Sequence, residues 1–238
     1  MQKKAHPVTA VPGQRLLSGF FVAVIAGAFI LALIILLLPG GTFLALSNYL
    51  QIITAMIGAL ALLYLWNNNR TNETYLFAAA GFGLWGISNI GWYAIVLSGQ
   101  RALVFPSIID LGMIASFLVI AMAFRKGFPV VKKTSPLIHL ILAACLIIPA
   151  AVIALAGLNA ATIITLAYFF VCGAFLIIGL VHSLSDHPEI LAGAFLFALA
   201  FMIYPLREMF LVNQPVLSVI GTFVSAGFAL MVLGWLPE

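Results

Sequence analysis

Charged side chains are scarce in this chain. Lysine, arginine, aspartate and glutamate make up 7% of its 238 residues, whereas hydrophobic residues make up 65% and the mean hydropathy is +1.24. Soluble chains carry roughly a quarter charged residues. Because a soluble domain of this size could not hide so much apolar surface, the composition predicts a protein that lies in a lipid bilayer.

The motifs of several enzyme classes are also missing. The sequence contains no His-Glu-x-x-His zinc motif, no Gly-x-Ser-x-Gly elbow and no cluster of acidic residues for a diphosphate-bound metal. No facing histidines at mid-membrane depth could ligate a haem, and no lysine lies inside an apolar run to carry a retinal. We therefore predict no metal and no cofactor, and favour a function other than catalysis. A hydrolase built on Asp110 would need a second acid–base group, which only Glu208 offers.

Cysteine is nearly absent. Cys145 and Cys172 lie in the middle of two apolar runs and have no pair of histidines near them in the sequence. They make neither a metal site nor a redox motif, so the pattern predicts two buried, small apolar side chains without a disulfide.

Long apolar runs dominate what remains. Crossing about 30 Å of hydrocarbon takes about 20 apolar residues in a helix, and continuous runs of that length exclude the alternating strands of a β-barrel. The eight runs are Leu16–Leu38, Tyr49–Trp66, Thr74–Leu97, Leu103–Phe124, Pro136–Leu158, Ala161–Val181, Ile190–Val212 and Val216–Leu236. The sequence therefore predicts an all-α polytopic integral membrane protein. Residues 1–15 are expected to form a cytoplasmic tail and residues 16–236 a single eight-helix transmembrane domain, with no soluble catalytic domain.

Basic residues predict the orientation of these helices. With a cytoplasmic N-terminus, the inner segments hold Lys3, Lys4, Arg15, Arg70, Arg125, Lys126, Lys132 and Lys133, and only Arg101 and Arg207 lie toward the outside. An even number of spans returns the C-terminus to the cytoplasm. We thus expect a multi-pass protein of the cell membrane. Topology and anionic inner-leaflet lipid explain its net charge of +4 without a nucleic-acid partner.

The two halves of the chain have similar organisation. A displacement of 116 residues overlays the first four apolar runs on the last four and places Gly41 on Gly157, Glu73 on Glu189, Ala78 on Ala194 and Trp85 on Phe201. The possible halves are residues 16–124 and 136–236. Four spans per unit would make the halves a parallel tandem repeat, related by an axis along the membrane normal. Similar hydropathy alone is the alternative explanation of this overlay.

Three charged residues fall inside the predicted membrane: Asp110, Arg207 and Glu208. Asp110 is about 10 Å and Arg207 about 8 Å from the outer ends of their spans, at 1.5 Å per residue. An unpaired charge at such a depth costs several kcal/mol. We therefore expect Asp110 to pair with Arg207, the basic residue available inside the membrane.

Aromatic and amide side chains accompany this charged layer. Asn89, Trp92 and Tyr93 share one face of the third span by their spacing, and Pro205 is expected to kink the seventh span beside Arg207. The sequence predicts an outward-facing site for a small ligand with a ring or a charge. Its residues are Asp110, Arg207, Asn89, Trp92, Tyr93, Trp85, Tyr204 and Glu208. The alternative is structural: aromatic residues that anchor the membrane interface, and an ion pair that locks two helices.

A short part of the chain resembles a known family. Trp85-Gly86, Gly91-Trp92-Tyr93 and Phe105-Pro106-Ser107-Ile108-Ile109-Asp110 are similar to the Trp/Tyr-rich helix and the Phe-Pro-Ser-x-x-Asp motif of eight-span sensor regions. In microbes these regions precede histidine-kinase or diguanylate-cyclase modules. The resemblance implies that Trp92, Pro106 and Asp110 belong to a signal-input site whose output passes to a separate protein through helix contacts.

These patterns together predict a membrane module that senses or binds a small ligand from the outer side and signals to a membrane or cytoplasmic partner. Two other functions remain open at the level of sequence. One is a transporter or channel for a small solute or ion, in which Asp110 would titrate or bind a cation. The other is a scaffold subunit of a membrane complex, in which the charged pair would be structural.

Overall fold

The computed structural model describes residues 14–37, 42–97, 108–130, 136–182, 187–204 and 214–236. Over these residues the chain forms eight α-helices and no strand, which confirms the predicted all-α class. The helices are α1 (Gln14–Leu37), α2 (Thr42–Asn68), α3 (Glu73–Leu97), α4 (Ile108–Gly127), α5 (Pro136–Ala156), α6 (Ala160–Val181), α7 (Pro188–Ile203) and α9 (Gln214–Trp235). Each of the eight predicted runs overlaps one helix.

Several of these helices suit a bilayer. Five of them, α1, α2, α5, α6 and α9, are long and apolar enough to cross a membrane. Large apolar side chains on α1 and α5 are highly exposed, among them Leu36, Leu37, Leu140, Leu146 and Ile147. Contiguous apolar surface of this kind is unfavourable in water and favourable in lipid. The protein is therefore a multi-pass membrane protein.

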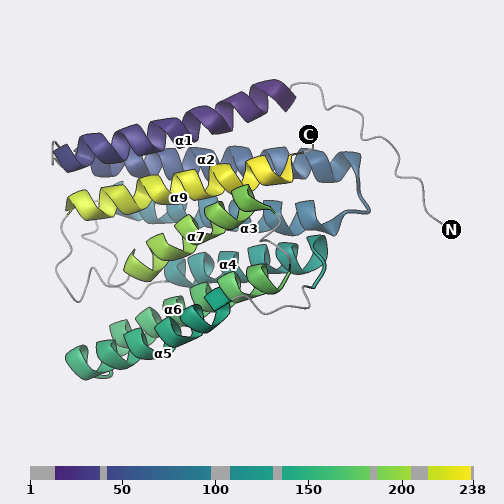
Figure 1. Ribbon diagram of the computed structural model, residues 1–238. Coiled ribbons are helices and arrows are strands. Elements are labelled where there is room, and N and C mark those ends of the chain that lie inside the picture. The colour runs from purple at the N-terminus through teal and green to yellow at the C-terminus, as the bar shows by residue number, and fades with distance from the viewer. Residues whose placement is uncertain are drawn as a thin grey trace.

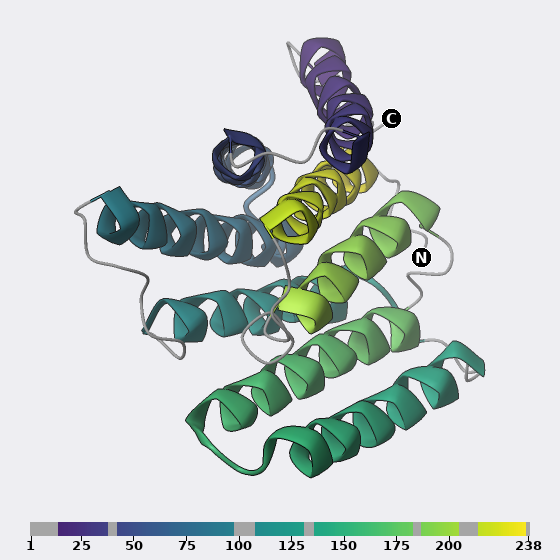
Figure 2. The ribbon, with the colours of Figure 1, turned by 90° about the vertical axis from the view of Figure 1, so that its left-hand side faces the viewer.

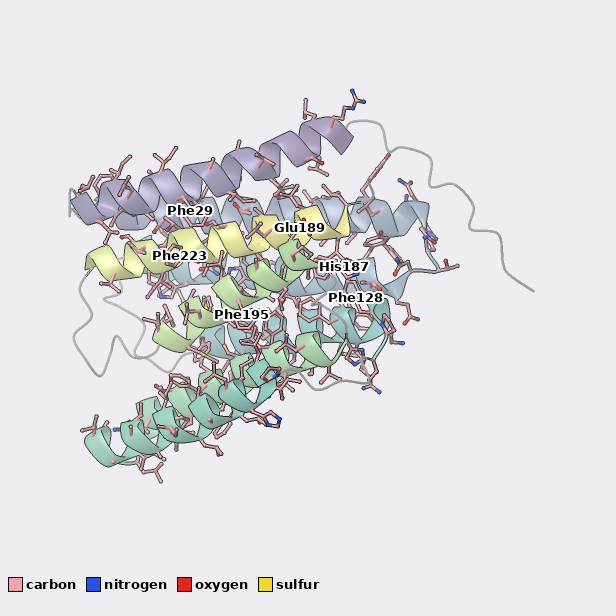
Figure 3. The ribbon with its side chains drawn as sticks, viewed as in Figure 1. Phe29, Phe128, His187, Glu189, Phe195 and Phe223 are labelled. Carbon is pink, nitrogen blue, oxygen red and sulfur yellow. The ribbon has the colours of Figure 1, made fainter. Side chains whose placement is uncertain are left out.

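Six helices form a closed ring. In order around it, α2 contacts α3, α3 contacts α4, α4 contacts α6, α6 contacts α7, α7 contacts α9, and α9 returns to α2. The other two helices lie outside: α1 packs on α9 and α2, and α5 packs on α6 (Figures 1 and 2). Phe29 of α1 meets Phe223 of α9, with ring centroids 6.3 Å apart (Figure 3).

Basic residues gather at one end of the bundle. The first residue of α1 and the last residue of α9 lie at this end (Figure 1). Arg15 lies in the first turn of α1, Arg125 and Lys126 lie in the last turn of α4, and Arg70 follows α2. Lys126 Nζ lies 2.7 Å from Glu73 Oε2 at the start of α3. We call this the basic end and the opposite one the far end. All four basic residues in the described part of the chain therefore share one end, as the positive-inside pattern requires.

Glycines allow two helix pairs to approach closely. On α3, an added Cβ at Gly81 would lie 3.1 Å from the backbone nitrogen of Ile120 on α4. On α7, an added Cβ at Gly193 would lie 2.5 Å from the carbonyl oxygen of Gly227 on α9. Small residues drive helix association in membranes because they bring backbones into contact. The pairs α3–α4 and α7–α9 are consequently the tightly packed units of the ring.

The helix contacts repeat between the two halves of the chain. The pairs α2–α3 and α3–α4 correspond to α6–α7 and α7–α9, and the α4–α6 contact between the halves corresponds to α2–α9. The outer helices differ, since α1 packs mainly on α9 whereas α5 packs on α6. Gly81 matches Gly193 in these contacts, one helical turn away from the gap-free overlay. This pattern is the one expected of a parallel tandem repeat, which stays a prediction.

Aromatic side chains fill the space enclosed by the six helices. Trp85 is 0% exposed and meets Phe201 with centroids 4.3 Å apart at 82°, and Phe117 stacks on Phe197 at 4.2 Å. Phe228 of α9 also contacts both Trp85 and Phe197. We call Trp85, Phe117, Phe197, Phe201 and Phe228 the aromatic core. It joins α3, α4, α7 and α9.

Both cysteines are buried and free, so the prediction of buried cysteine side chains is confirmed. The Cys145 thiol of α5 packs over Gly173 of α6 and lies 3.6 Å from the carbonyl oxygen of Phe169. Cys145 and Gly173 thus belong to the contact that holds α5 on α6.

Candidate functional site

A buried carboxyl group lies in the first turn of α4. Asp110 is 4% exposed and accepts a hydrogen bond from the Tyr168 hydroxyl of α6, with 2.9 Å between the oxygens. Tyr168 is itself fully buried. A carboxyl group removed from water needs hydrogen-bond donors or a countercharge, and here a tyrosine from the other half of the chain supplies one donor.

The surroundings of this hydrogen bond are partly aromatic. Tyr168 stacks on Phe201 at 5.9 Å and meets Tyr204 of the α7 end at 6.2 Å. Its hydroxyl also lies 3.8 Å from the Met113 sulfur, one turn along α4 from Asp110. We call Asp110, Met113, Tyr168 and Tyr204 the Asp110 site. Through Phe201, this site is continuous with the aromatic core.

Two predicted site residues, Trp85 and Asn89, are buried on α3. Trp85 belongs to the aromatic core, and the Asn89 side-chain amide donates to the Trp85 carbonyl oxygen at 3.2 Å. Asn89 is buried, so its amide is used within its own helix. Neighbouring Ser88 lies against Gly112 of α4, where an added Cβ would overlap the Ser88 hydroxyl. The contact of Ser88 with Gly112 therefore packs α3 closely against α4 at the level of Asp110.

Trp92 and Tyr93 form a separate aromatic group nearer the end of α3. Tyr93 lies 4.9 Å from Tyr49 of α2 and 6.2 Å from Trp92, measured between ring centroids. Trp92 and Tyr93 are half-buried, and Tyr49 is exposed. Partly exposed Trp and Tyr near a helix end are typical of the membrane interface. The ring contacts of this group join α2 to α3, whereas the contacts of the Asp110 site join α4, α6 and α7.

Arg207 and Glu208 lie outside the described residues, as do Pro106 and Pro205. The expected pairing of Asp110 with Arg207 therefore stays a prediction.

The corresponding contact between the halves, α2–α9, is polar but neutral. An added Cβ at Gly221 of α9 would lie 2.5 Å from the Gln51 amide nitrogen and 2.9 Å from the Ser47 hydroxyl of α2. Ser47, Gln51 and nearby Ser218 are all buried. The α2–α9 contact thus uses a hydroxyl and an amide where the α4–α6 contact uses a carboxyl group and a phenol.

The sequence interpretation missed two residues of the Asp110 site, Met113 and Tyr168, of which Tyr168 makes the hydrogen bond to Asp110. Tyr168 lies in an apolar run, without a charged neighbour in sequence. A usable signal was present, because a tyrosine hydroxyl in the middle of a membrane span needs an acceptor and a buried aspartate needs a donor. Only the position of α6 beside α4 shows that the two residues meet.

The Asp110–Tyr168 hydrogen bond should be measurable by a double-mutant cycle. Tyr168→Phe removes the donor and leaves the carboxyl group buried, which is expected to lower the free energy of unfolding by about 1–3 kcal/mol. Asp110→Leu removes the acceptor. Each single variant deprives the remaining group of this bond, whereas the double variant removes both groups, so the double variant should cost less than the sum of the single variants. Thermal unfolding in detergent gives the four values. Additive effects would contradict the bond.

The chemistry available at this site is hydrogen bonding and charge pairing. Within the described ranges, no three His, Cys, Asp or Glu side chains come together to hold a metal ion. Comparisons of the chain with known protein families, with curated proteins and with solved structures find no match in any of the three.

Proposed function

We propose that the protein is a membrane-embedded sensor. The Asp110 site, at the far end of the bundle, binds a small ligand from the outer side, and the change passes to a partner protein at the cytoplasmic side. In this proposal the basic end faces the cytoplasm of a cell membrane, with both chain termini there. The observation that carries it is the buried Asp110 carboxyl group, bonded across α4 and α6.

The contrast between the two contacts that join the halves, α4–α6 and α2–α9, supports a functional carboxyl group. Helix packing alone needs no charge at this place, since the equivalent α2–α9 contact is made by Ser47, Gln51 and Gly221. An ionisable group inside a membrane is expensive to bury and is a candidate for function by default. The resemblance of the Phe105–Asp110 segment to sensor input regions favours the same residue.

The mid-membrane hydroxyl groups favour sensing over transport. Thr54 donates to the Leu50 carbonyl oxygen at 2.7 Å, Thr222 to Val219 at 2.7 Å and Ser225 to Gly221 at 3.0 Å. These groups are satisfied within their own helices. Between α4 and α6, the rings of Phe117, Phe124 and Phe175 lie on the way from the Asp110 site to the basic end. Apolar rings at this place favour sensing over transport, because a transporter needs a continuous polar path.

A ligand screen tests the proposal. The purified chain is heated with small molecules that carry a ring, a positive charge or both, and a ligand at one hundred times its Kd should stabilise it by about 2.7 kcal/mol. Tyr168→Phe and Asp110→Asn should lose most of this gain. Ser225→Ala, which removes a hydroxyl bonded within α9, should keep it. A ligand that stabilises the Asp110→Asn protein as well as the wild type would place its site elsewhere.

A further inference from the structure

Two hydrogen bonds join α4 to α6, one toward each end of the bundle, and we call them the two ties. Toward the far end, the Tyr168 hydroxyl donates to Asp110. At the basic end, the His182 ring nitrogen Nδ1 lies 3.0 Å from the carbonyl oxygen of Phe128. Since a carbonyl oxygen can only accept, Nδ1 carries the proton in this bond. Phe128 directly follows α4 and His182 directly follows α6, so the second tie fixes the two helix ends to each other.

Large rings fill the space between the two ties. Phe175 of α6 meets Phe117 of α4 at 5.3 Å and Phe124 of α4 at 5.1 Å. The corresponding α2–α9 contact has Gly58 under the Val232 side chain and Gly221 under Gln51 and Ser47. Glycines bring helix backbones into contact, whereas large side chains between two helices keep the backbones apart. The α4–α6 contact is thus the less closely packed of the two contacts between the halves, and we expect α6 to shift on α4 more readily than α9 on α2.

The basic-end tie leads directly to surface residues. The Phe128 ring also meets the His187 ring, with centroids 4.7 Å apart, at the start of α7 (Figure 3). His187 and Glu189 are exposed, and so are Arg125 and Val130 beside Phe128. The ends of α4 and α6 and the start of α7 therefore converge on Phe128. A shift between α4 and α6 would change the surface that they present.

We propose that the α4–α6 contact couples the Asp110 site to the basic end. This inference rests on the proposed function and adds its route of regulation: a ligand that competes for the Asp110 carboxyl group or the Tyr168 hydroxyl changes the position of α6 on α4. The His182–Phe128 tie and the His187 contact then change with it. In this coupling, the position of α6 on α4 has two states, and each tie stabilises the same one of them from its own end. A change at either end therefore alters the other end, so the coupling is reciprocal.

Hydrogen exchange of the full chain in lipid nanodiscs tests the coupling without any ligand. Tyr168→Phe is expected to speed amide exchange by about fivefold at Val181, His182, Phe128 and in the first turn of α7. His182→Ala should in turn speed exchange in the first turns of α4 around Asp110. The matched controls are Ser225→Ala, whose hydroxyl bonds within its own helix, and His139→Ala, an exposed histidine of α5. Both should leave exchange at the opposite end unchanged.

Two results would overturn the coupling. One is a change confined to the end that carries the substitution. The other is a uniform increase that includes α1 and α9, which would indicate general destabilisation. Failure of the coupling can be distinguished from failure of the proposed function. If a ligand binds at Asp110 but exchange effects stay local, the sensor site is supported and the α4–α6 coupling is contradicted. Exchange effects at the opposite end, in a protein that no ligand stabilises, would support the α4–α6 coupling and contradict the proposed sensor function.

Discussion

Replacing Gly193 of α7 with leucine is expected to destabilise the protein far more than the same substitution at Gly19 or Gly27 of α1. An added Cβ there would lie 2.5 Å from the Gly227 carbonyl oxygen and 2.8 Å from the Met231 backbone nitrogen. Both are backbone atoms of α9, so no side chain can rotate away and the two helices must separate. Overpacking of this kind costs about 3 kcal/mol at the upper end of its usual range. For a chain of this size that corresponds to a melting temperature lower by about 10 °C.

Thermal unfolding in detergent, followed by size-exclusion chromatography, measures this loss. Gly27→Leu on α1 is the matched control, because an added Cβ at Gly27 meets nothing within 4 Å and leucine favours both helix and lipid. Its melting temperature should stay close to that of the wild type. Equal losses in the two variants would show that backbone contact between α7 and α9 is not the cause.

Replacing Trp85 with alanine is expected to cost about 3–5 kcal/mol, the range for removing a large aromatic side chain from a core. Trp85 contacts four phenylalanine rings from α4, α7 and α9, so its loss leaves a cavity where four helices meet. Within the described residues its indole Nε1–H has no hydrogen-bond partner. Trp85→Phe therefore forfeits ring volume and no hydrogen bond, and should cost much less than Trp85→Ala.

Trp92→Ala provides the comparison for this prediction on the same helix. Trp92 is half-buried and is joined by a ring contact to Tyr93, so the same truncation should lower the melting temperature by a clearly smaller amount. Similar losses for Trp85→Ala and Trp92→Ala would mean that the aromatic core is not the centre of stability.

Prediction from sequence succeeded where one local property decides the outcome. The eight apolar runs became eight helices because a backbone in lipid must satisfy its own hydrogen bonds, whatever its neighbours are. The gathering of Arg15, Arg70, Arg125 and Lys126 at one end follows from the alternation of helix direction and needs no knowledge of packing. Burial of Cys145 and Cys172 follows from their positions inside apolar runs.

The candidate site was predicted less completely, because its members come from different helices. Asp110 could be singled out from its charge alone, yet its partner Tyr168 lies 58 positions away in a run with no charged residue. Asn89, Trp92 and Tyr93 were grouped by helical spacing, but Asn89 bonds its own helix while Tyr93 contacts Tyr49 of α2. Spacing defines a face of a helix and does not define which helix covers it.

The sequence by itself determined the solvent, the secondary structure and the end at which the basic residues lie, because composition and periodicity act within single helices. Tertiary structure alone decided the ring order of the six helices, the close contact of Gly193 with Gly227 and the bond between Asp110 and Tyr168. The physical reason is that lipid provides no hydrophobic force between helices. Helix partners are then selected by complementary shape and by hydrogen-bonding groups on the two helices. These contacts depend on both helix surfaces, so the sequence of one helix does not reveal them.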